Sequence, residues 1–129
     1  MKLLLALLAL LSQTACSSAP EAGPDAVGHA VVFSCPDRDL LLTLEQDLED
    51  LMAITPGVLE AHVGPRADVA VREGVTDVDY DVLLWVSFVD EHALQTYLVA
   101  PEHVALVGRY LPSLTRVTVF DAWIGRAVE

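Results

Sequence analysis

Residues 80–89 read YDVLLWVSFV, a nearly continuous apolar run rather than an alternation of apolar and polar residues. A run of this kind is typical of a β-strand that is covered on both faces. Helices of the same chain can cover one face, but a domain this small has little left for the other. We therefore expect a partner subunit on the second face, and the run predicts an oligomer.

Local signals place the elements around this strand. Leucines at helical spacing mark the longest helix, with Asp37 or Asp39 to cap its start and Pro56-Gly57 to end it. In chain order we expect a strand at 30–33, a helix at 37–55, a strand at 58–63, the strand at 80–89, a helix from Asp90 to Val99, a helix at 101–110 and a strand at 115–123. Residues 64–79 form a loop, with room for a short strand at 69–71. Because the two short helices make one broken unit, the order β-α-β-β-α-β predicts a ferredoxin-like α+β fold.

The start of the chain differs in composition from the rest. Residues 1–11, MKLLLALLALL, carry one lysine and then a short apolar run. That run is too short to span a bilayer, which takes about 20 residues, but it is typical of a secretory signal. Residues 12–20, SQTACSSAP, resemble the end of a bacterial lipoprotein signal, which is cut before the cysteine, whose thiol then receives lipid. Gln13 departs from that pattern, and ordinary cleavage after Ala19 is the alternative.

The chain therefore divides into a signal peptide at 1–15, a lipidated Cys16 with a flexible tether at 16–27, one domain at 28–124 and a tail at 125–129. This organisation predicts a protein of the bacterial cell envelope, held by its lipid to a membrane and facing the periplasm. The alternative is a soluble secreted or periplasmic protein.

Charge and cysteine content exclude several classes of function. The 19 acidic and 7 basic side chains give a net charge of -12, which excludes nucleic acid, whose phosphates need a basic patch. The same balance excludes electrostatic docking on anionic lipid. With Cys16 as the anchor, Cys35 has no partner, so we expect no intrachain disulfide. The four histidines have no metal-ligand spacing, and we expect neither a metal nor another cofactor.

Several motifs together resemble one known family. They are His29-Ala30-Val31-Val32-Phe33, Thr55-Pro56-Gly57-Val58, Tyr80-Asp81, Phe88, Leu94-x-x-Tyr97-x-x-x-Pro101-x-His103 and Val119-Phe120-Asp121. In this order they resemble the stress-responsive dimeric α/β-barrel domain, often called Dabb, over residues 28–123. The resemblance implies a homodimer in which two four-stranded sheets face each other and close a barrel, with the helices outside.

Residue spacing predicts a pocket between the sheet and the helices. Strand parity puts His29, Val31 and Phe33 on one face. Helical spacing puts His103, Val107 and Tyr110 on one stripe, and Tyr97 shares a stripe with Ala93 and Leu94. We therefore expect His29, Tyr97 and His103 to point into the same space, with Val31, Phe33, Val107 and Tyr110 as apolar lining.

The resemblance implies a chemistry for these three polar residues. Their positions match two histidines and a tyrosine in the family's plant polyketide cyclases, which perform an intramolecular aldol condensation. An imidazole takes a proton from a carbon next to a carbonyl, and a tyrosine or a second imidazole stabilises the enolate oxygen. The sequence departs from the family pattern at Ala100, where many members have a histidine before the proline.

Three hypotheses about function follow. The first is a small envelope protein of undefined chemistry that binds a small apolar ligand. The second is a cyclase- or isomerase-type enzyme that uses His29, Tyr97 and His103 on a polyketide-like carbonyl substrate. The third is a protein-interaction module. In the first and third, the same three residues serve only to line a pocket, to form hydrogen bonds in the core or to cap the broken helix.

Overall fold

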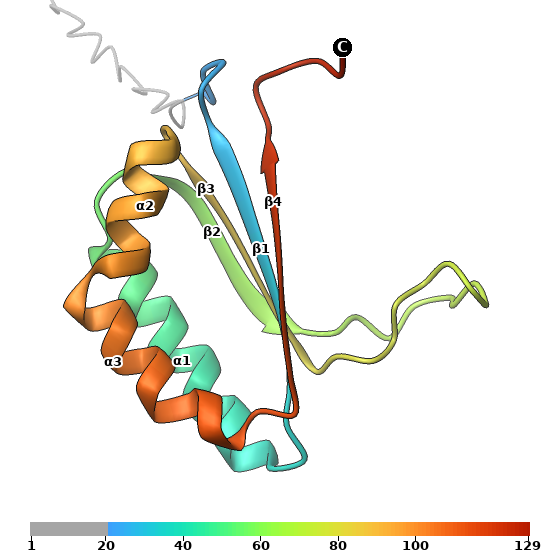
Figure 1. Ribbon diagram of the computed structural model, residues 1–129. Helices are drawn as coiled ribbons and strands as arrows, with labels where there is room; N and C mark the ends of the chain where they lie inside the picture. Colours follow the sequence, from blue (N-terminus) through green and yellow to red (C-terminus); the bar gives the residue numbers. More distant parts are fainter. Residues whose placement is uncertain (1–20) are drawn as a thin grey trace, which may run out of the picture.

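The computed structural model describes residues 21–129, which form one antiparallel sheet with helices over one of its faces (Figure 1). The elements are β1 (Val27–Ser34), α1 (Arg38–Ile54), β2 (Val58–Pro65), β3 (Val82–Phe88), α2 (Glu91–Val99), α3 (Pro101–Tyr110), a short 3-10 helix (Leu111–Ser113) and β4 (Arg116–Trp123). The four strands lie in the order β2-β3-β1-β4. This is the ferredoxin-like α+β fold predicted from the sequence.

The expected signal peptide and Cys16 lie outside the described residues. The domain begins with β1 at Val27, and residues 124–129 follow β4 without forming a helix or strand. Within residues 21–129, no helix is both long enough and apolar enough to cross a membrane.

Side-chain caps set the helix boundaries where the sequence predicted them. The Asp37 carboxylate accepts hydrogen bonds from the first backbone N–H groups of α1, and Asp90 accepts one from Ala93 N–H at 2.8 Å. Pro101 starts α3 because its missing N–H costs nothing in the first turn of a helix. The short strand expected at 69–71 was wrong, because residues 66–81 run from β2 to β3 as a loop without a strand.

The core lies between the sheet and the helices. Alternate residues of β3 point toward the helices, and Val82, Leu84, Val86 and Phe88 are at most 1% exposed. They pack against the leucine stripe of α1, including Leu44. The apolar run of β3 therefore supplies one fully covered face from within a single chain.

The other face of the sheet is not covered by helices (Figure 1). The strand register places Ala30 opposite Trp85 on one side and opposite Phe120 on the other, so these side chains share this face. Trp85 lies across Gly28, where a Cβ atom would stand only 2.4 Å from the indole. Phe120 is 55% exposed. Half of the expectation from residues 80–89 is thus met within one chain, and the second face remains apolar and open.

Candidate functional site

A buried imidazole and a half-exposed carboxylate form the polar centre of the domain. His29 on β1 pairs in register with Asp121 on the edge strand β4, so both side chains project from the helix-covered face. His29 Nδ1 lies 2.6 Å from Asp121 Oδ1. The His29 side chain is 4% exposed and that of Asp121 is 50% exposed. With Asp121 ionised, Nδ1–H donates to the carboxylate and Nε2 is left as the basic nitrogen.

Tyr97 lies beside His29, and His103 in turn contacts Tyr97. The ring centroid of Tyr97 lies 6.0 Å from that of His29 in an edge-on arrangement and 4.4 Å from that of His103. Phe88 lies on another side of Tyr97 at 5.4 Å. The structure therefore brings His29, Tyr97 and His103 together, with Tyr97 between the two imidazoles.

The break between α2 and α3 positions His103. Ala100 is extended because a residue before proline avoids helical backbone angles, and this frees carbonyl groups at the end of α2. His103 Nδ1 donates a hydrogen bond to one of them, the carbonyl of Leu98, at 3.0 Å. Burial lowers the pKa of His103 and the nearby His29 lowers it further, against the Leu98 carbonyl, which raises it. His103 is therefore neutral at neutral pH, and it caps α2.

Tyr97 supplies a hydroxyl that keeps its proton. The residue is only 4% exposed, and this burial raises its pKa to about 12. At neutral pH the phenol is therefore a hydrogen-bond donor. A donor beside two imidazoles has the composition that proton transfer at a carbonyl compound requires.

The expected apolar lining residues have other positions. Val31 and Phe33 belong to the packed core, and Val107 is half-buried. Tyr110 is 2% exposed, and its hydroxyl donates to Asp47 Oδ2 on α1 at 2.6 Å. Asp47 also accepts a hydrogen bond from Arg109. Tyr110 thus joins α3 to α1.

An open cleft lies beside the polar centre, between α2 and β4. It has a volume of about 270 Å³ and is lined by Val27, Glu91, Leu94, Gln95, Leu98, Asp121, Ala122 and Trp123. We call it the α2–β4 cleft. Asp121 belongs both to this cleft and to the hydrogen bond with His29. Sequence reasoning gave Asp121 no role in the site, although the parity of β1 and the register of an adjacent β4 would have placed it beside His29.

The other candidate residues, Cys35 and His62, form hydrogen bonds away from this site. Cys35 is buried, and its thiol donates to the Ser113 carbonyl at 3.3 Å. His62 is an exposed residue whose Nε2 lies 2.7 Å from a carboxylate oxygen of Glu60. Across residues 21–129, no three His, Cys, Asp or Glu side chains gather closely enough to hold a metal ion.

Comparison with known proteins identifies relatives of the fold. No curated protein matches the chain. A dimeric ferredoxin-like protein of unknown function from Thermobifida fusca is 19% identical, with a TM-score of 0.62 over 77% of this chain and 91% of its own. A Dabb family protein from Mesorhizobium loti is 21% identical, with a TM-score of 0.62 over 75% and 94%. Hydroxynitrile lyase from Passiflora edulis is 16% identical, with a TM-score of 0.67 over 82% and 99%.

At these identities the solved structures establish the fold alone. The family follows from a separate match, since the family model described as the stress responsive A/B barrel domain, Dabb, aligns with residues 27–124. This range contains every helix and strand of the structure. The chain therefore belongs to the stress-responsive A/B barrel (Dabb) domain family.

Proposed function

We propose that this protein binds a small, mainly apolar molecule in the α2–β4 cleft, as a lipid-anchored homodimer of the bacterial cell envelope. The observation that carries the binding function is the cleft itself. Aliphatic and aromatic walls from Leu94, Leu98 and Trp123 meet a few ordered polar groups. Asp121 is held by its hydrogen bond to His29, and Glu91 accepts a hydrogen bond from Gln95 at 2.7 Å. Apolar walls around a few fixed polar groups are typical of small-molecule sites.

The lining of the cleft limits the charge of its ligand. Glu91 and Asp121 are the charged residues among its lining, and both are acidic. Carboxylates repel an anionic ligand and accept hydrogen bonds from a neutral or cationic one. The ligand is therefore an apolar molecule that carries a hydroxyl or amine donor.

The uncovered sheet face supports the dimer. Trp85 and Phe120 stand on a face with no helix over it, and apolar patches of this kind mark interaction sites. Structural neighbours that share the fold are dimeric. A second copy, packed sheet against sheet, would cover the open face of β3. The apolar run at 80–89 predicts that this face is covered.

Proton transfer is the second candidate function. The His29–Asp121 hydrogen bond favours it, because a carboxylate on Nδ1 orients the ring and leaves Nε2 as a base. Tyr97, with its pKa raised to about 12, is the donor for a developing oxyanion. The chemistry is then a cyclase- or isomerase-type reaction at the carbon beside a carbonyl.

We expect the neutral dye N-phenyl-1-naphthylamine to bind in the cleft, because it combines an apolar body with one N–H donor. Its anionic relative 8-anilino-1-naphthalenesulfonate differs by one sulfonate. We expect the affinity of the protein for this anion to be lower by a factor of about ten or more. Leu98→Asp adds a third carboxylate to the cleft and should weaken binding of the neutral dye by a similar factor. Fluorescence titration measures both effects.

The control for this titration is Val104→Asp, which adds a carboxylate at a position on α3 that is 57% exposed. It should leave dye binding unchanged. Equal weakening by Leu98→Asp and Val104→Asp, or equal binding of the two dyes, contradicts a ligand site in the cleft.

The proton-transfer hypothesis predicts exchange at a carbon acid. Acetophenone in D₂O should lose its methyl protons faster with the protein than in buffer, as followed by proton NMR. His29→Gln should abolish this acceleration and leave dye binding within about twofold, since the glutamine removes the base without filling the cleft. An exchange rate equal to that of buffer counts against an enzyme of this type.

Disruption of the sheet face should separate the subunits. Phe120→Asp puts a charge in the centre of the proposed interface, where it loses its hydration. Light scattering on the purified protein should give the dimer mass for the unaltered chain and for Val104→Asp, and the monomer mass for Phe120→Asp. A monomer at micromolar concentration before any substitution refutes the dimer.

The lipid anchor is tested at Cys16. Cys16→Ser removes the thiol that would receive the lipid, so metabolic labelling with a radioactive fatty acid should disappear in a bacterial host. Cys35→Ser, at the other cysteine, should keep the label. Labelling that persists in Cys16→Ser is incompatible with an anchor at this residue.

A further inference from the structure

The loop at residues 66–81, which joins β2 to β3, projects from the sheet on the side opposite to the helices (Figure 1). Most neighbouring antiparallel strands are joined by roughly two to five residues, so this loop is much longer than the connection requires. Long loops in compact domains commonly have a function of their own. We call this one the β2–β3 arm. A body packed against the open sheet face would lie beside it.

The arm is attached to the open face of the sheet. Ser34 on β1 and Arg116 on β4 are partners in the strand register, and strand parity puts both on the same face as Phe120. The Ser34 hydroxyl donates to the Asp79 carbonyl at 3.1 Å, and the Arg116 guanidinium donates to the same carbonyl at 2.6 Å. These bonds come from the face that no helix covers, so they direct the arm to that side.

An ion pair strengthens this attachment. Two guanidinium nitrogens of Arg116 contact the two carboxylate oxygens of Asp77, at 3.1 and 2.8 Å, and paired bonds of this kind are stronger than a bond between neutral groups. The hydrogen bond from Arg116 lowers the pKa of Asp77, so the carboxylate stays ionised at neutral pH. Arg116 therefore holds the arm at two points, Asp77 and Asp79.

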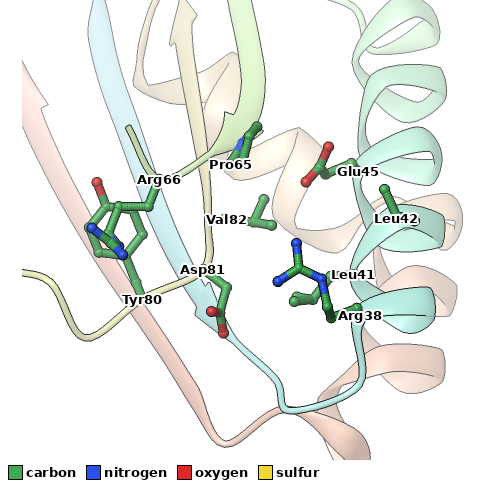
Figure 2. A pocket seen from close by; sticks show the side chains of 9 residues that line it. All are labelled: Arg38, Leu41, Leu42, Glu45, Pro65, Arg66, Tyr80, Asp81 and Val82. Atoms are coloured by element: carbon green, nitrogen blue, oxygen red, sulfur yellow. The ribbon is translucent and has the colours of Figure 1, made fainter. Parts of the chain in front are cut away.

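Backbone hydrogen bonds set the base of the arm. Arg66 N–H donates to the Asp81 carbonyl at 2.8 Å, and Asp81 N–H donates to the Phe33 carbonyl at 2.8 Å. Figure 2 shows this end of the arm, where Arg66 and Tyr80 lie together and apart from Arg38 on α1. The two halves of the arm thus start from a fixed pair of residues.

A closed turn forms the tip of the arm. Val75 N–H and Thr76 N–H both donate to the Arg72 carbonyl, at 3.1 and 2.9 Å, and the Thr76 hydroxyl accepts a hydrogen bond from Arg72 N–H at 2.9 Å. Gly74 has a φ of 73°, a conformation that favours glycine. Because base, middle and tip are all hydrogen-bonded, the arm is ordered before a partner arrives, which lowers the entropic cost of binding.

Four valines give the arm an exposed apolar surface. Val69, Val71, Val75 and Val78 are between 47% and 79% exposed. Apolar side chains that gather on a projecting segment mark an interaction site, since covering them removes apolar surface from water. The arm projects away from the helices that enclose the core (Figure 1), so a single chain leaves these valines in water.

We propose that the β2–β3 arm packs its valines against a second copy of this chain that covers the open sheet face. The proposal rests on the homodimer proposed above and extends its interface beyond the sheet. The occupant is a second copy because Ser34 and Arg116 hold the arm on the same face that carries Phe120. A subunit that covers Phe120 therefore meets the arm as well. In a twofold dimer this contact occurs twice, once for each arm.

Val71→Asp tests the contact, because it puts a carboxylate among the valines. We expect the dissociation constant of the dimer to rise by a factor of about ten or more, measured by sedimentation velocity over a dilution series. The matched control is Val104→Asp on α3, since Val71 is 55% exposed and Val104 is 57% exposed. The control should have the dissociation constant of the unaltered chain.

Removal of the arm is the second test. Arg66 and Asp81 are already hydrogen-bonded to each other, so a two-residue Asn-Gly turn can replace residues 67–80. This shortened chain should keep the circular dichroism of the folded domain, and its dimer should be weakened as much as that of Val71→Asp or more.

A photoreactive residue locates the contact directly. With p-benzoylphenylalanine in place of Val75, illumination should give a covalent dimer on a denaturing gel. The same residue in place of Val104 should leave only monomers. Monomers alone from the first of these chains contradict the arm contact.

The outcomes distinguish this proposal from the dimer itself. If the unaltered chain is a monomer, the homodimer and the arm contact both fail. If Phe120→Asp separates the subunits but Val71→Asp and the shortened chain keep the original dissociation constant, the sheet contact stands and the arm contact is refuted. Equal weakening by Val71→Asp and Val104→Asp also overturns the arm contact, because it shows an effect of added charge alone.

Discussion

The central position of β1 in the sheet determines how both faces are used. β1 pairs with β3 along one edge and with β4 along the other, so a shift of one residue would exchange its two faces. In the observed register, His29 lies against Asp121 on the helix side, and Ala30 lies between Trp85 and Phe120 on the open side. The polar centre and the open apolar face are therefore two results of one hydrogen-bonding pattern.

The buried polar centre and the open apolar face both cost the folded chain free energy, for opposite reasons. Burying His29 costs free energy unless its ring is hydrogen-bonded, and Asp121 supplies that bond at 2.6 Å from the edge strand. Exposing Phe120 and Trp85 leaves apolar surface in water, which costs roughly 25 cal/mol for each Å². Asp121 and Phe120 are neighbours on β4, so a partner that covers the open face also steadies the strand that holds His29. Through β4, assembly is thus linked to the site.

Much of the fold could be predicted from local sequence signals. Contacts that depend on which strands pair, and in which register, could not. Asp37, Asp90 and Pro101 act within one turn of their helices, so their caps and breaks could be read directly from the sequence. Parity also placed His29, and the helical stripe placed His103. The partnership of His29 with Asp121 depends on which strand lies beside β1, which no local pattern contains. For the same reason, the stripe of α3 identified Tyr110 as inward-facing but could not predict its hydrogen bond to Asp47, 63 residues away.

The acidity of the chain bears directly on the chemistry of the α2–β4 cleft. A net charge of -12 gives a negative potential that repels anions and raises the local concentration of cations near the surface. Salt screens this field within about 8 Å at physiological ionic strength, so a binding site needs its own local charges to select a ligand. The charged groups that line the α2–β4 cleft are both carboxylates, so the cleft is negatively charged like the chain as a whole. The local charges of the cleft and the field of the whole chain thus have the same sign, and both disfavour an anion.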